Sequence, residues 1–218
     1  SAIGPDSEAF QNNRADMLAL VDWLRVLEER AHQASAARRA VFEKRGQIPP
    51  HDRIARLLDP GMPFLRLHSL ANYLVEDTDP ETSVPGASMI CGIGFVAGVR
   101  CMVWADDSGI RAGAMTRMSL PAALSVQEIC RRQKLPLIHL VESAGADLMN
   151  LAVESWAQGG AVFRNLARLG AAGIPTIAVL HGPSTAGGAY MPGLSDYVIG
   201  VRRNGMAALA GPALVEAA

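Results

Sequence analysis

The sequence has few residues of the kinds that build metal and redox sites. Its three cysteines, Cys91, Cys101 and Cys130, form neither a CxxC pair nor a zinc-type spacing. Two of them lie in apolar runs, where a free cysteine acts as a small hydrophobic residue, and this usage is typical of a reduced intracellular compartment. His139 and His181 form no metal-spaced set with a carboxylate, so we predict no metal site and expect two buried histidines with satisfied hydrogen bonds.

An excess of one charge and long apolar runs are also missing. Lys and Arg number 20 against 21 Asp and Glu, and this net charge of −1 disfavours a broad nucleic-acid-binding or anionic membrane surface. No apolar stretch could span a bilayer without an interrupting proline, glycine or charge, and the N-terminus has no signal-peptide pattern. We therefore expect neither nucleic acid nor a membrane as a partner. Half of the 218 residues are apolar, which is enough for a real core.

The pattern of apolar and polar residues divides the chain into two regions. Residues 1–60 predict a helical arm, with a helix over 8–45 and a short one over 51–58; its part at 31–44, rich in alanine and arginine, is expected to be exposed or to face a partner. Residues 61–218 then show an α/β order that starts with a hairpin. The predicted strands are 88–96, 99–105, 135–141, 174–180, 197–201 and 206–210, and the predicted helices are 120–133, 151–169 and a short one from 187.

Glycines in two of these elements call for a reason. Gly92 and Gly94 weaken the first hairpin strand and indicate a close approach of backbone there. Gly159 and Gly160 lie inside a predicted helix, where they cost stability, so we expect them to serve packing. The last residues, 211–218, look like the opening of a further helix, so we expect the polypeptide to continue.

The most informative segment is Thr185-Ala186-Gly187-Gly188-Ala189-Tyr190. It follows a predicted strand and a short loop over 181–184, and its glycine pair leaves the backbone bare where a helix begins. Such a position can aim unpaired N–H groups at a developing negative charge. The spacing also fits tight helix–strand packing or a turn, so both interpretations stay open at this point.

A second loop, Ser143-Ala144-Gly145-Ala146, follows the strand predicted over 135–141. In a parallel sheet this strand and the one over 174–180 would be neighbours, and ligands bind at such carboxyl ends. One N–H group from each loop would make a two-donor hole for a thioester oxygen. The chemistry that this pattern favours is stabilisation of an oxyanion by the backbone.

Four segments, taken in order, resemble one known family. They are KRGQIPPHDRIARLLDPGMPFLRL at 44–67 and the stretches 85–107, 127–146 and 173–202. They are similar to the N-terminal half of the carboxyltransferase (β) subunits of biotin-dependent acyl-CoA carboxylases, closest to those for methylcrotonyl-, geranyl- and propionyl-CoA. The resemblance implies an α/β crotonase (ClpP-like) fold, a spiral of ββα units, here with an N-terminal helical arm.

The resemblance also implies the site and the cofactor. Backbone N–H groups of Gly187 and Gly188 would hold the enolate of an acyl-CoA, and biotin, which supplies the base, would be carried by a partner subunit or domain. The chain would then act with a biotin carboxylase and biotin carrier subunit in a homo-oligomer, in the bacterial cytoplasm or the mitochondrial matrix. Because Ala144 replaces a family glycine, the shape of the first loop stays open. The residues expected to bind the substrate are Ser143, Ala144, Gly145, Ala146, Ala186, Ala189 and Tyr190.

Other functions and other roles for polar residues remain open. One alternative is a stand-alone enoyl-CoA hydratase or isomerase, which would need carboxylates near the glycine loop; the nearest one in the sequence is Asp196. An acyl-CoA decarboxylase subunit and a non-catalytic assembly subunit are further alternatives. Glu142 would be a general base or, by preference, a helix cap or arginine partner. Ser184 lacks a GxSxG context and is expected in a turn or cap. Residues 106–107 are expected in a solvated turn rather than at a cation site. The arginine pairs at 131–132 and 202–203 would either contact CoA phosphates or lie on solvated faces. Tyr190 would pack its helix or line an acyl pocket.

Overall fold

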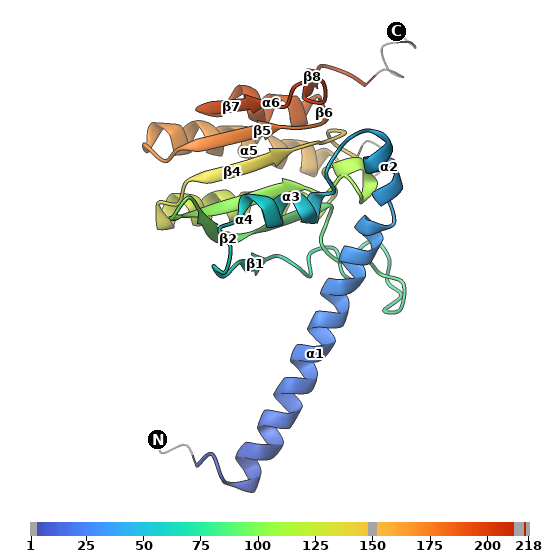
Figure 1. Cartoon of the computed structure of the whole chain (residues 1–218), viewed down its shortest axis with the longest axis vertical. Coiled ribbons are helices and arrows are strands. Elements are labelled where there is room, and N and C mark those ends of the chain that lie inside the picture. The colour runs from blue at the N-terminus through green and yellow to red at the C-terminus, as the bar shows by residue number, and fades with distance from the viewer. Residues whose placement is uncertain (1–3, 148–151, 212–215, 217–218) are drawn as a thin grey trace.

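A central sheet with helices on both faces forms the body of the protein. The computed structural model describes residues 4–147, 152–211 and 216. Figure 1 shows the sheet and one long helix, α1, that stands away from it. The strand order is β1-β2-β3-β4-β5-β7; the first three strands are antiparallel, and β3, β4, β5 and β7 run parallel. The bounds are β1 Leu65–Leu67, β2 Met89–Val96, β3 Val99–Asp106, β4 Leu137–Val141, β5 Thr176–Leu180 and β7 Tyr197–Gly200.

The helices match most of the predicted ones. Helix α6 begins at the glycine pair, as expected, and α4 and α5 lie between the parallel strands along the chain. None of the described helices has the length and apolar content that crossing a membrane requires. The bounds are α1 Glu8–Ala36, α2 Arg39–Lys44, α3 Pro50–Leu57, the 3-10 turn η1 Arg111–Gly113, α4 Ser119–Gln133, α5 Val153–Ala171 and α6 Gly187–Gly193.

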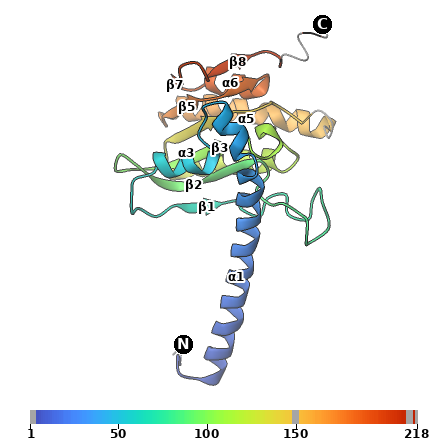
Figure 2. The same cartoon turned by 45° about the vertical axis from the view of Figure 1, so that its right-hand side comes forward.

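The N-terminal helices differ from the prediction in two ways. The helix expected over 8–45 is broken after α1, and α2 forms a separate turn of helix. The expectation that 31–44 is exposed or faces a partner is wrong for its inner face, because Ala31, Ser35 and Phe42 are only 2%, 2% and 3% exposed. The exposed part of α1 lies earlier in the chain: Figure 2, like Figure 1, shows that end clear of the sheet, and Trp23 there is 50% exposed.

Alternating side chains of β3 build a core on each face of the sheet. Met102 and Trp104 point to the side covered by α4 and α5, whereas Cys101 and Val103 point to the side where α3 contributes Ile54. Full burial of a side chain such as Met102, Val103 or Ile54 stabilises the fold by about 1.5–3 kcal/mol. The three cysteines are buried and free, which confirms the hydrophobic role predicted for Cys91 and Cys101. Burial raises the pKa of the Cys91 and Cys130 thiols to about 12.

The glycines in the hairpin and in α5 behave differently. A Cβ on Gly92 would lie 2.5 Å from the Leu65 carbonyl oxygen and one on Gly94 would lie 2.5 Å from a Leu58 methyl, which confirms the close approach. The packing role predicted for Gly159 and Gly160 is wrong for the described part of the chain, because a Cβ at either position would meet no atom within 4 Å.

Two short strands were not predicted. β1 adds to the hairpin, and β6 (Pro183–Thr185) occupies the segment expected as a loop. β6 pairs in parallel with β8 (Met206–Ala208) in a small separate sheet. The further helix expected over 211–218 falls mostly outside the described residues.

Candidate functional site

The two predicted loops lie side by side at the carboxyl ends of β4 and β5. These strands pair in parallel, with Val141 opposite Leu180. Beyond them the Thr185 N–H donates to the Ser143 carbonyl at 3.0 Å, and the Ser143 N–H donates to the Pro183 carbonyl at 3.2 Å. The strand order predicted from the sequence therefore placed the loops correctly.

The glycine pair confirms the packing interpretation at Gly188, and its free N–H groups leave the oxyanion interpretation as a prediction. A Cβ on Gly188 would lie 2.9 Å from the Ser143 Cβ, closer than real side chains approach, so glycine is needed for packing between the loops. Gly187 and Gly188 are also the first residues of α6, where an N–H group has no partner within the helix. Neither N–H donates to any acceptor in the part of the chain that the structure describes.

The first loop offers one donor. The N–H groups of Ser143, Ala144 and Gly145 donate to the Pro183 carbonyl, the Ala112 carbonyl and the Ser143 Oγ, at 3.2, 3.1 and 3.1 Å. Within the described ranges only Ala146 of this loop keeps its N–H without an acceptor. The loop's positive φ, +86°, falls at Gly145, so the replacement of glycine by Ala144 does not disturb its shape.

Backbone strain lies directly before the glycine pair. Ala186 has φ 48° and ψ −120°, a conformation that a residue with a Cβ rarely adopts. It is held there because its N–H donates to the Ala208 carbonyl and its carbonyl accepts from the N–H groups of Ala189 and Tyr190. Such a conformation costs about 1–3 kcal/mol and tends to occur at functional sites.

An apolar groove opens beside α6. Three of the residues predicted to bind substrate, Ala186, Ala189 and Tyr190, line it together. Tyr190 is 61% exposed and its ring centroid lies 5.6 Å from that of Phe163, so the side chain packs on α5 and lines the groove. Residues 143–146 do not line the groove. Its volume is about 440 Å³, and its lining is completed by Gly193, Leu194, Ala207, Ala208 and Leu209.

A buried polar cluster lies beneath the loops, and the sequence did not predict it. Asp106 and Asp107, expected in a solvated turn, are only 5% and 2% exposed, so that expectation is wrong. Asp106 accepts from the Glu142 N–H at 3.2 Å and lies 3.1 Å from His139 Nε2. The His139 ring also stacks on Trp104, which confirms it as a satisfied core histidine.

His181 is buried but not satisfied. Neither ring nitrogen has a hydrogen-bond partner among the described residues, so the predicted hydrogen bonding is wrong. Its Nδ1 lies 3.5 Å from Glu142 Oε2. Burial, assisted by the Arg53 charge, lowers the pKa of His181 to about 3. The ring is therefore neutral at physiological pH, and the two side chains do not form an ion pair there.

Glu142 and Ser184 also lie in settings that the sequence did not indicate. Glu142 caps no helix and has no arginine at ion-pair distance in the described part of the chain; its oxygens accept from Gln47 and Ser108, each at 2.9 Å. Ser184 lies in β6 rather than a turn, and its buried Oγ has no hydrogen-bond partner among the described residues. Neither side chain is therefore exposed to act on a substrate.

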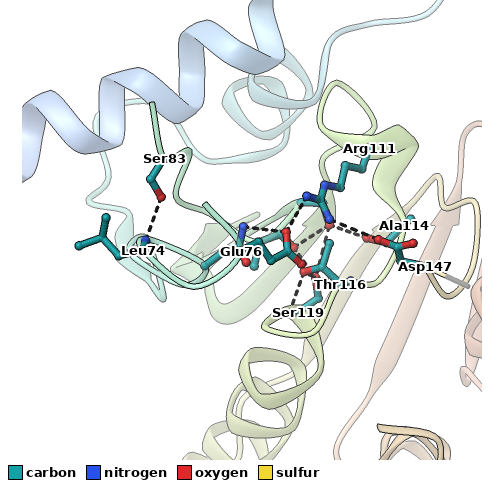
Figure 3. A network of polar contacts seen from close by, with 11 residues as sticks. Leu74, Glu76, Ser83, Arg111, Ala114, Thr116, Ser119 and Asp147 are labelled. Carbon is teal, nitrogen blue, oxygen red and sulfur yellow. Dashed lines mark hydrogen bonds and ion pairs between the residues drawn. The ribbon is translucent and has the colours of Figure 1, made fainter. Parts of the chain in front are cut away.

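An arginine braces the far end of the first loop. Figure 3 shows Arg111 between Glu76 and Asp147, with N···O distances of 2.6 and 3.3 Å. The adjoining backbone is also tied, because the Asp147 N–H donates to the Met115 carbonyl and the Met115 N–H to the Gly145 carbonyl. These bonds fix the residues on both sides of the free Ala146 N–H.

The two arginine pairs considered for CoA phosphates lie on exposed faces. Arg131 and Arg132 both bind Glu128 on the surface of α4, at 2.7 and 2.6 Å. Arg202 and Arg203 are exposed beyond β7. Both pairs lie on solvated faces, and their contact with CoA phosphates stays a prediction.

Comparison with known proteins now identifies the class. The profile of the carboxyl transferase domain family matches residues 42–218, and the chain therefore belongs to that family. The match confirms the resemblance seen in the four sequence segments. The chain spans only about two fifths of the length of the relatives that it matches.

Individual relatives narrow the similarity. The chain is 39% identical over 219 residues to a Mycobacterium tuberculosis protein named "Probable biotin-dependent acyl-coenzyme A carboxylase beta2 subunit", covering 100% of this chain and 40% of that one. It is 38% identical over 223 residues to the mitochondrial methylcrotonoyl-CoA carboxylase beta chain of Arabidopsis thaliana, covering 99% and 37%. The crystal structure of the P. aeruginosa geranyl-CoA carboxylase beta subunit superposes with a TM-score of 0.87 at 46% identity, covering 97% and 40%. These likenesses confirm the predicted mixed α/β, crotonase-like fold.

Proposed function

We propose that this chain is the acyl-CoA-binding half of the carboxyltransferase β subunit of a biotin-dependent acyl-CoA carboxylase. The observation that carries the proposal is that three backbone N–H groups on adjoining loops, those of Gly187, Gly188 and Ala146, have no acceptor among the described residues. An apolar groove adjoins them, lined by residues of α6 and β8. This arrangement fits a thioester whose oxygen meets the N–H groups while its acyl chain contacts the groove.

The residues of the chain would stabilise charge rather than move protons. When the α-proton leaves an acyl-CoA, negative charge develops on the thioester oxygen, and the fixed N–H groups of Gly187 and Gly188 would stabilise that enolate. Because both loops are bonded to each other, these donors need no rearrangement as the charge forms. A pre-positioned donor of this kind is typically worth on the order of a hundredfold in rate, or a few kcal/mol.

The base is expected from outside the chain. Biotin, carried by a partner subunit or domain, supplies both the carboxyl group and the base. The groove fits this division of labour, since no acidic or histidine side chain is among the described residues that line it. Two candidates considered from the sequence are occupied or buried: Asp196 accepts from Thr176 at 2.8 Å, and His181 is 2% exposed. The same observation disfavours an enoyl-CoA hydratase or isomerase.

The assembly follows from the same proposal. A biotin carboxylase and a biotin carrier would deliver the loaded cofactor, and copies of the subunit would form a homo-oligomer. The work would take place in the bacterial cytoplasm or, for a eukaryotic protein, in the mitochondrial matrix.

A reconstituted assay tests the proposal. The full subunit is assembled with its cognate biotin carboxylase and biotin carrier, and ATP, labelled bicarbonate and a panel of acyl-CoA thioesters are added. We expect ATP-dependent incorporation of label into at least one acyl-CoA. Hydration of an enoyl-CoA without any carboxylation would contradict the proposal, and loss of CO₂ from a carboxylated acyl-CoA as the sole activity would favour a decarboxylase subunit.

A further inference from the structure

One buried ionisable group beside the site has no part in the proposed chemistry. Glu142 is the first residue after β4 and directly precedes the loop that carries Ala146. It is only 4% exposed. Burying a carboxylate is costly unless hydrogen bonds compensate for the lost water, so its partners show what the position is for.

The Glu142 carboxylate joins three segments that are distant in the sequence. Gln47 Nε2 donates to its Oε1 at 2.9 Å across 95 residues, and Ser108 Oγ donates to its Oε2 at 2.9 Å across 34 residues. Gln47 lies between α2 and α3, and Ser108 lies between β3 and η1. One carboxylate thus bridges the N-terminal helices and the segment that supports the first loop.

The same side chain lies against the start of the second loop. A Cβ added at Gly182, just after β5, would overlap the carboxyl group of Glu142, so the two residues are in direct contact. A Cβ added at Gly113 would overlap the Glu142 carbonyl oxygen. Glu142 is therefore enclosed between the segment that holds the first loop and the segment that leads to Gly187.

We propose that Glu142 is a positioning residue, whose side chain sets the spacing between the two N–H-bearing loops by bridging Gln47 and Ser108. The inference rests on the proposed function, because the spacing matters only if both loops bind one oxygen. Misplacement of a catalytic donor by about 1 Å can lower a rate by roughly a hundredfold. The bridge acts by its reach and its hydrogen bonds rather than by its charge.

A feature of Gln47 allows reach and charge to be separated. Gln47 Oε1 is buried without a partner among the described residues. In Glu142→Gln the new amide N–H would replace the oxygen that accepts from Gln47 Nε2, so the Gln47 amide would turn over and accept through Oε1 instead; the remaining side-chain oxygen at 142 would still accept from Ser108. Glu142→Asp keeps the charge but is one methylene shorter, so it cannot reach both partners. If Glu142 acts as a bridge, glutamine at this position should preserve function better than aspartate. If its charge matters, aspartate should preserve function better.

The test compares Glu142→Gln, Glu142→Asp and Glu142→Ala in the full subunit assembled with its partners. Amide hydrogen exchange is followed over residues 143–147 and 183–188, and kcat and KM are measured for acyl-CoA. For the aspartate and alanine variants we expect exchange in both loops to rise about tenfold or more and kcat to fall roughly 10- to 100-fold, with KM within about threefold. The glutamine variant should stay within about threefold of the wild type on each measure. Glu128→Gln, on the exposed face of α4, is the matched control and should change nothing.

The outcomes are distinct. The bridging role would be contradicted if Glu142→Asp kept near-normal kcat and loop exchange while Glu142→Gln lost them. Unchanged loop exchange in every variant would contradict it as well. If Glu142→Ala does not fold, the comparison of kcat and loop exchange between Glu142→Gln and Glu142→Asp still decides between reach and charge. If the wild-type subunit carboxylates no acyl-CoA, the proposed function fails, but the exchange measurements still decide the role of Glu142.

Discussion

Gly188 and Ser143 lie so close that a Cβ at Gly188 would stand 2.9 Å from the Ser143 Cβ. The contact joins the start of α6 to the loop after β4. It explains why Gly188 must be glycine for packing at the position where we propose an N–H donor. A substitution that breaks the contact must move at least one donor.

Gly188→Ala should therefore impair the reaction more than it impairs folding. The added methyl would push the loops apart and so displace the N–H groups that we propose bind one oxygen. We expect kcat to fall on the order of a hundredfold, with KM for acyl-CoA changed much less. Steady-state kinetics of the reconstituted carboxylase measures this effect. If Gly188→Ala turned over at the wild-type rate, the glycine pair would not be part of the site.

Gly160→Ala is the matched glycine change. A Cβ there meets no described atom within 4 Å, and α5 is helical at that point. We expect the free energy of unfolding to rise by about 0.5–1 kcal/mol, because alanine favours the helix, with no change in kcat. Denaturant unfolding measures the gain; a loss of stability would show that the position packs against another part of the assembly.

Ala186→Gly should relieve strain. Because Ala186 holds φ 48° and ψ −120°, glycine removes a cost of about 1–3 kcal/mol and adds about 0.5–1 kcal/mol of unfolded-state entropy. The variant should be as stable as the wild type or more so. Ala189→Gly, within α6, should instead lose about 0.5–1 kcal/mol. Equal losses in both variants, by thermal unfolding, would argue against strain at Ala186.

His181 should make the fold sensitive to acid. Its pKa is lowered from 6.5 to about 3 by burial, so below pH 6.5 the unfolded chain binds a proton that the native protein does not. Stability from this group is therefore complete above pH 6.5 and is lost as the pH falls toward 3. Between pH 6.5 and 5 the wild type should lose about 1.5 kcal/mol more than His181→Gln. Denaturant unfolding at the two pH values measures the difference; identical losses would show that His181 protonates in the native state.

Arg111→Ala should loosen the end of the first loop. Arg111 is partly exposed and binds two carboxylates, so we expect about 1 kcal/mol of local stability to be lost. Amide exchange at Met115 and Asp147, whose N–H groups make the hydrogen bonds at this end of the loop, should rise about fivefold. Arg131→Ala, which removes a surface contact to Glu128, is the control and should leave that exchange unchanged.

The sequence predicted the order of elements and the adjacency of the loops well. Two apolar runs joined by a short turn identified β2 and β3, and the parallel order then placed the loop at 143–146 beside the loop that leads to Gly187. Local patterns suffice for such features because they depend on neighbours in the sequence.

What the sequence missed depends on contacts between distant residues. The burial of Asp107 follows from a hydrogen bond to Ser35, 72 residues away, and the bridge at Glu142 depends on Gln47, 95 residues away. No local pattern marks these pairs. The strain at Ala186 was missed for a similar reason, since its conformation is held by Ala208 on another strand.

The most direct test of the central claim is a crystal structure of the full subunit with a bound acyl-CoA. We predict a thioester oxygen within about 3.2 Å of at least two of the backbone nitrogens of Gly187, Gly188 and Ala146, with the acyl chain along the groove at Tyr190. A thioester oxygen bound away from all three nitrogens would contradict the account.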